Sequence, residues 1–69
     1  MTNQEQRLLS ALAWMCAQYL EGRDGELDHQ SMSAGERAVD LLVRYGLISP
    51  SGRGGSWTEA GQALLARID

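Results

Sequence analysis

The sequence predicts one small, mostly α-helical domain of three helices, with a short β-hairpin between the second and the third helix. Apolar residues recur at helical spacing in two separate segments. Residues typical of helix N-caps stand at the start of each of the three predicted helices. A glycine-rich turn at 49–56 (SPSGRGGS) interrupts the helical pattern before the last helix. The length suits a single domain, so we assign 1–69 to one unit.

The chain is too short for a large hydrophobic core. A core of this size supplies about 3–5 kcal/mol of stability, and the single cysteine, Cys16, excludes an internal disulfide. We therefore expect support from a homodimer. The polar start and the short, interrupted apolar run 8–20 indicate neither a secretory signal nor a membrane span. This predicts a cytoplasmic protein without membrane association.

The first helix is predicted from Gln4 to about Glu21, because Asn3 and Gln6 form a capping-box pattern and no glycine or proline interrupts the run. Its apolar residues form two neighbouring stripes, which together are wide enough for two contacts. One contact is the rest of the domain, and the other is the same helix of a second protomer. The stripe assigned to the dimer interface comprises Leu8, Leu12, Met15 and Tyr19; the second comprises Leu9, Ala13, Cys16 and Leu20.

The segment 22–31 (GRDGELDHQS) breaks the helical pattern, because it is polar and contains two glycines. It has room for one short helical turn. Ser33 and Glu36 form the next capping box, so the second helix is predicted from about Ala34 to Tyr45. The inward face of this helix is predicted to contain Ala34, Ala38, Leu41, Leu42 and Tyr45.

Gly46 is predicted to end the second helix through a left-handed conformation, and 47–48 leaves it as an extended segment. The turn 49–56 carries Arg53 at its tip, and Trp57 re-enters the structure as an apolar anchor that packs onto the helices. Thr58 then caps the third helix, and Glu59 suits the positive end of its dipole. Its inward residues are predicted to be Ala60, Leu64 and Ile68.

Three pieces follow one another within 44–65: Gly46-Leu47-Ile48, the turn around Arg53, and Thr58-Glu59-Ala60-Gly61 with Leu64 and Leu65. This order resembles winged-helix regulators of the MarR and PadR type over about a third of the chain. In those proteins a recognition helix ends in a Gly-Leu-Ile-like exit, and a hairpin wing leads to the next helix. The resemblance implies that 33–45 is the recognition helix and that Arg53 is the wing-tip residue entering the minor groove of DNA.

The charge pattern permits DNA binding without favouring it. The net charge is −3, and all six cations are arginines, which suit forked contacts to carboxylates and phosphates. The outward face of the second helix carries Arg37 and Arg44 beside two acids, and we expect Arg37, Asp40 and Arg44 to pair with one another. Four further acids lie within 21–28, where they would repel phosphates. A dimer would nevertheless present Arg37, Arg44 and Arg53 twice, so DNA remains a possible partner.

Trp14 favours protein binding. On the wheel of the first helix it lies away from the stripe that begins at Leu8, on the side of Arg7, Gln18 and Glu21. Two placements fit this position. Either Trp14 faces solvent as an interface anchor, or it packs beneath the hairpin or the third helix.

The sequence offers no catalytic residue, cofactor site or metal site. His29 has no second histidine near it, and metal sites need three or four convergent ligands. Cys16 is predicted to be a buried thiol. The leading hypothesis is a non-enzymatic regulatory protein that binds a partner protein through Trp14, Arg37, Arg44 and Arg53. Its profile resembles small inhibitors from phages and mobile elements that block host regulatory or defence proteins. The alternatives are a homodimeric winged-helix DNA-binding transcriptional regulator and a purely structural dimerisation module.

Overall fold

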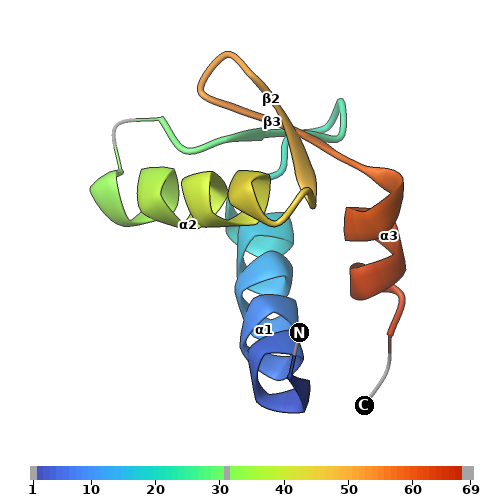
Figure 1. The fold of residues 1–69 in the computed structure, drawn as a ribbon. Helices are drawn as coiled ribbons and strands as arrows, with labels where there is room; N and C mark the ends of the chain where they lie inside the picture. The colour runs from blue at the N-terminus through green and yellow to red at the C-terminus, as the bar shows by residue number, and fades with distance from the viewer. Residues whose placement is uncertain (1, 31, 68–69) are drawn as a thin grey trace.

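The computed structural model describes residues 2–30 and 32–67, which form three helices and one three-stranded antiparallel sheet. Figure 1 shows α2 crossing one end of α1, the sheet lying over this end, and α3 running beside α1 in the opposite direction. The predicted class, a mostly α domain with a hairpin between the second and third helices, is confirmed at this level. In chain order the elements are α1 (Asn3–Tyr19), β1 (Glu26–Asp28), α2 (Ser33–Arg44), β2 (Ile48–Ser51), β3 (Gly54–Trp57) and α3 (Glu59–Leu65).

The capping box of α1 is one residue earlier than predicted. Thr2 is the N-cap, and its hydroxyl accepts a hydrogen bond from the Glu5 backbone N–H at 3.0 Å. The Glu5 carboxylate accepts in return from the Thr2 N–H at 3.2 Å. The predicted pair Asn3 and Gln6 is therefore wrong. A carboxylate at the third helical position suits the positive end of the helix dipole better than an amide does.

The predicted second stripe of α1 forms the centre of the core. Leu9, Ala13, Cys16 and Leu20 are all buried. The helix ends at Tyr19 rather than near Glu21, because Glu21 instead forms a β-bridge with Leu27. The core is completed by Leu27, Ala38, Val39, Leu42, Leu47, Ile48 and Leu64 from the other elements.

The break at 22–31 contains a strand, β1, and its described part has no helical turn. A turn leads into β1: Gly25 has φ 80°, and the Asp24 carboxylate accepts from the Glu26 N–H at 3.0 Å. β1 pairs with β3, with Leu27 opposite Gly55. The sheet order is therefore β1-β3-β2, with the middle place taken by the last strand of the chain.

α2 begins at Ser33 without the predicted capping box. Met32 is the N-cap, and no side chain caps the helix. The predicted inward face is also wrong in part, because only Ala38 and Leu42 of that set are buried while Ala34, Leu41 and Tyr45 are exposed. The face that packs inward includes Gly35 instead, where an added Cβ would lie 3.2 Å from the Cβ of His29. Because Gly35 has no side chain, α2 can lie close to His29, and the side of α2 that carries Gly35 packs toward the body of the protein.

The hairpin forms as predicted. Gly46 ends α2 with φ 74°, and 47–48 passes into the core, where both side chains are buried. β2 and β3 are joined by a two-residue loop, Gly52-Arg53, in which Gly52 has φ 54°. Trp57 packs against the core as predicted, and its indole N–H donates to a Glu21 carboxylate oxygen at 2.6 Å. This bond ties the end of the hairpin to the end of α1.

α3 is capped by Thr58, as predicted. The Thr58 hydroxyl accepts from the Gly61 N–H at 3.1 Å and donates to the Gly46 carbonyl oxygen at 2.7 Å. Gly61 and Leu64 face inward, whereas the predicted Ala60 is exposed. An added Cβ at Gly61 would overlap the backbone before β2, so the glycine determines which face of α3 packs. Ile68, also predicted to face inward, lies outside the described residues.

Candidate functional site

The exposed side of α1 is unusual because it carries no charged residue after Arg7. From Leu8 to Leu20 the sequence contains no acidic or basic residue. Large apolar side chains nevertheless face solvent, with Leu8 67% exposed, Trp14 52% and Tyr19 72%. A surface helix normally covers its outer face with charged residues, and contiguous exposed apolar surface marks sites of interaction. α1 therefore has more apolar surface than this domain covers.

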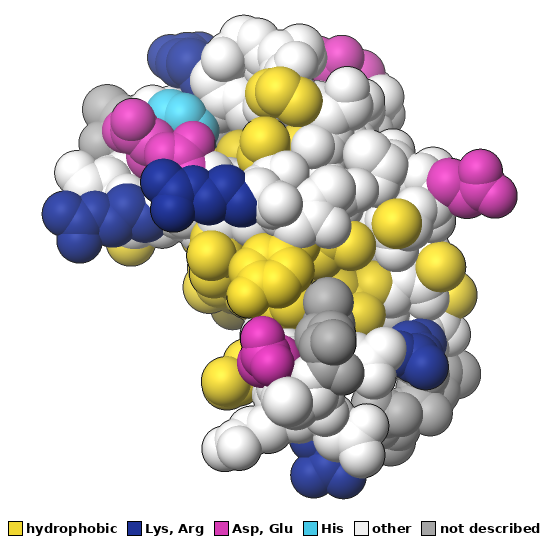
Figure 2. All heavy atoms as spheres, viewed as in Figure 1, with side chains coloured by type: hydrophobic (Ala, Val, Ile, Leu, Met, Phe, Trp, Pro, Cys, Tyr) yellow, Lys and Arg dark blue, Asp and Glu magenta, His cyan; other side chains and the backbone are white. Residues whose placement is uncertain are grey.

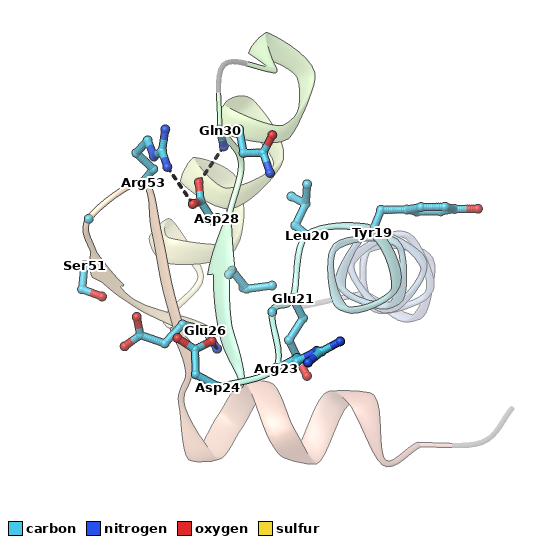
Figure 3. Close-up of a pocket in the computed structure, with 13 residues that line it drawn as sticks. Tyr19, Leu20, Glu21, Arg23, Asp24, Glu26, Asp28, Gln30, Ser51 and Arg53 are labelled. Carbon is cyan, nitrogen blue, oxygen red and sulfur yellow. Dashed lines mark hydrogen bonds and ion pairs between the residues drawn. The ribbon is translucent and has the colours of Figure 1, made fainter.

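The residues predicted to form a dimer interface lie along one side of α1. Leu8, Met15 and Tyr19 are exposed, and Leu12 is half-buried against the core. Tyr19 extends away from the body of the protein in Figure 3. The stripe is thus available for contact.

α2 adds apolar residues that the sequence interpretation had placed in the core. Leu41 is 40% exposed and Tyr45 42%. Figure 2 shows hydrophobic side chains gathered in the angle where α2 crosses α1, with basic and acidic side chains above them on α2. We call the set Leu8, Leu12, Met15, Tyr19, Leu41 and Tyr45 the α1–α2 face.

The two helices of this face adjoin at Tyr45, the C-cap of α2. The pKa of Glu5, in the first turn of α1, is lowered mainly by the hydrogen bond from the Thr2 backbone N–H, and the nearby Tyr45 side chain contributes least. The α1 and α2 parts of the face therefore meet where Tyr45 lies beside the first turn of α1.

Trp14 faces a different part of the surface. It lines an open hollow of about 320 Å³, together with Arg7, Ser10, Ala11 and Arg67. Trp14 therefore faces solvent beside the end of α3, away from the hairpin, and its role as an interface anchor stays a prediction. Sequence reasoning placed Arg7 on the side of Trp14 from the helical wheel. Arg67 was missed, because only the antiparallel packing of α3 on α1 brings it there.

The other predicted partner-binding arginines lie apart from Trp14. The guanidinium of Arg53, at the hairpin tip, forms an ion pair with Asp28 at 3.0 Å, shown in Figure 3. Arg37 and Arg44 are exposed on α2. The predicted pairing of Arg37 and Arg44 with Asp40 is wrong, because Arg53–Asp28 is the sole ion pair within 2–30 and 32–67. The four predicted residues therefore do not meet in one hollow.

A further hollow, of about 810 Å³, is lined by four acids and two arginines. It lies between the end of α1, β1 and the hairpin tip. Three of its four carboxylates have local partners: Glu21 accepts from Trp57, Asp24 caps the turn before β1, and Asp28 accepts from the Gln30 backbone N–H at 2.8 Å. These bonds shape the loop 21–30 and give three of its acids, all but Glu26, a structural role.

The chemistry of the described residues is sparse. They contain no group of three metal-ligating side chains. The Nδ1 of His29 lies 2.9 Å from the Gln30 carbonyl oxygen, which is a local turn contact. Cys16 is fully buried, and burial raises the pKa of its thiol. The predicted burial of Cys16 is confirmed.

We expect Cys16 to resist alkylation in the folded protein. Attack requires the thiolate, which burial disfavours, and requires the core to open. Labelling by iodoacetamide at neutral pH should be at least about a hundredfold slower than labelling of free cysteine, and should accelerate when urea unfolds the chain. Mass spectrometry of quenched samples measures both rates. Rapid labelling without urea would contradict the packing of α1 in the core.

Comparisons of the chain with protein-family models, with curated proteins and with solved structures gave no match. The functional proposal is therefore argued from the residues and their geometry. Within the part of the chain that the structure describes, no helix combines the length and apolarity needed to cross a membrane.

Proposed function

We propose that this protein is a small non-enzymatic regulatory protein that acts as a homodimer by binding another protein. One observation carries the proposal: α1 is uncharged from Leu8 to Leu20 and exposes large apolar side chains on two sides. Apolar surface of this kind is stabilised by being covered, and exposed tryptophan and tyrosine are the side chains most enriched at binding hot spots. One side serves the second protomer, and the side of Trp14 serves the partner.

The α1–α2 face suits a second copy of the chain. A two-fold axis across the middle of α1 would pair the two helices in antiparallel fashion, with Leu8 of one copy near Tyr19 of the other. No charge within the stripe opposes this contact. An interface of standard size covers about 800 Å² on each partner, roughly one sixth of the 4938 Å² accessible surface. Such an area requires the stripe on α1 together with Leu41 and Tyr45.

The finer assignment of the fold as winged-helix-like is part of the proposal. It is supported by the hairpin that directly follows α2 and by the capped α3 after it. The DNA-binding alternative has less support. The wing-tip Arg53 is engaged by Asp28, and β1 occupies the place where a helix-turn-helix has its helix before the recognition helix. The acidic loop 21–28 also lies beside the hairpin tip. Together these features favour a protein partner over phosphates.

The proposal is tested by capturing partners from the native host, with and without nuclease, and identifying them by mass spectrometry. We expect partners that survive nuclease and that are lost with Trp14→Ala, since truncating an interface anchor costs about 2 kcal/mol or more of binding. Gln62→Ala, an exposed change on α3, serves as the control and should retain them. The DNA-binding alternative would replace the proposal if two results came together. Nuclease treatment would remove every partner, and the protein would bind duplex DNA in a salt-dependent way that Arg37→Glu with Arg53→Glu abolishes.

A further inference from the structure

α1 and α3 enclose a continuous groove on the side of Trp14. Three neighbouring hollows of about 320, 400 and 310 Å³ lie along it, and Arg67 borders all three. Gln6 and Arg7 each border two of them, which makes the hollows one surface. We call this surface the α1–α3 groove; its main residues are Gln6, Arg7, Ala11, Trp14, Ala63 and Arg67.

The groove is cationic in an acidic protein. The chain has nine acids and six arginines, yet no carboxylate of the described residues lines any of the three hollows. Arg53, by contrast, forms an ion pair with Asp28 at 3.0 Å. Glu59, the one acid of α3, stands at the far end of that helix from Arg67. Arg7 and Arg67 therefore present positive charge without local compensation among the described residues.

The groove is apolar in the two hollows that contain Trp14 and Ala63, and polar in the third, which is lined by Asn3, Gln6 and the two arginines. Ala11 on α1 and Ala63 on α3 are small, so the backbone of a bound segment can approach closely, and Trp14 provides a flat apolar wall at one end. Arginine guanidinium groups at the border bind carboxylates by forked hydrogen bonds. The groove thus combines two apolar hollows with cationic edges, which is complementary to an amphipathic segment with acidic flanks.

We infer that the α1–α3 groove is the docking site for an acidic, amphipathic segment of a partner protein. The inference rests on the proposed function and deepens it by naming the chemistry of the partner. A nucleic acid fits the groove less well. Single strands need successive aromatic side chains for base stacking, and the groove offers only Trp14. The net charge of −3 also repels a polyanion at long range, whereas a short acidic segment can orient its few carboxylates toward Arg7 and Arg67.

The test uses a library of random 12-residue peptides displayed on phage and selected on the purified protein. We expect the selected peptides to be enriched in Asp and Glu flanking leucine or an aromatic residue. One selected peptide is then synthesised with a fluorophore, together with a version in which each Glu is replaced by Gln. The acidic peptide should bind at least about tenfold more tightly than the Gln version at low salt, and the difference should shrink at high salt.

Arg7→Gln with Arg67→Gln should weaken binding of the acidic peptide by at least about tenfold. The control, Ser33→Glu with Gln62→Glu, changes net charge by the same amount at exposed positions outside the groove, and should leave binding within about twofold. Thermal melts compare the folding of the two variants. Each of three results would overturn the inference. The selected peptides could be neutral or basic, or both variants could weaken peptide binding equally. The third result is tight binding of single-stranded DNA that Arg7→Gln with Arg67→Gln abolishes.

Partner capture separates this inference from the proposed function. If Arg7→Gln with Arg67→Gln retains the nuclease-resistant host partner while Trp14→Ala loses it, the protein-binding function stands and the acidic-segment inference fails. If acidic peptides bind the groove but no host protein is retained with nuclease, the groove chemistry stands and the proposed function fails. Loss of the host partner in both variants, with selection of acidic peptides, supports both.

Discussion

Gly54→Ala is expected to unfold most of the protein. A Cβ at Gly54 would overlap the carbonyl oxygen and carbon of Leu27 on the neighbouring strand. These are backbone atoms held in the β1–β3 pairing, so no side-chain rotation relieves the overlap. β1 would have to separate from β3 and would withdraw the buried Leu27 from the core. We expect a loss of about 3 kcal/mol or more, against a total stability of about 3–5 kcal/mol for a domain of this size.

Urea and thermal unfolding followed by circular dichroism measure this loss. Ser56→Ala is the matched control, because Ser56 lies on the same strand with its side chain exposed. It should melt within a few degrees of the original protein, since surface substitutions usually change stability by about 0.5 kcal/mol or less. If Gly54→Ala melted with the control, the register that places Gly54 opposite Asp28 would be wrong.

Leu8→Glu with Tyr19→Glu is expected to convert a homodimer into a monomer. Both side chains are more than half exposed, so the change hardly alters the core of the monomer. In an antiparallel pair of α1 helices, however, each glutamate of one copy would lie near a glutamate of the other, in an apolar contact. Burying an unpaired carboxylate costs several kcal/mol, which exceeds what a contact of this size supplies.

Analytical ultracentrifugation measures the outcome. The original protein should sediment at about twice the chain mass of 7.6 kDa, and the double variant at the chain mass. Ser33→Glu with Gln62→Glu adds the same charge at exposed positions of α2 and α3 and should remain dimeric. A monomeric original protein at micromolar concentration would remove the homodimer from the proposal and would leave the α1–α2 face to the partner.

The parts of the fold that the sequence predicted well are those with local physical causes. Gly46 ends α2, Gly52 permits the hairpin loop, and Thr58 caps α3, each through contacts within a few residues along the chain. β1 was missed because its signal is not local. Its only apolar residue is Leu27, and its pairing partners are in β3. A three-residue strand of this kind has no stability apart from the strand beside it.

The candidate site divides in the same way. The helical wheel predicted that Trp14 lies away from the stripe that begins at Leu8 and on the side of Arg7, because both belong to one regular helix. It also predicted the stripe that contains Leu8 and Tyr19 and assigned it to a contact outside the domain, and both side chains are exposed. The wheel did not predict the contribution of Arg67, because that residue is brought to Trp14 by the packing of one helix on another.

The sequence by itself determined where each helix and the hairpin lie to within about one turn, since helical periodicity and positive-φ glycines act over one or two turns, although it misplaced the caps of α1 and α2. Only the tertiary structure decided which side of α2 faces inward, and that Arg67 lines the same hollow as Trp14 and Arg7. The physical reason is close approach between segments far apart in the chain. Gly35, Gly54 and Gly61 allow backbone to meet backbone or side chain at short distance, and these contacts fix the rotation of each element.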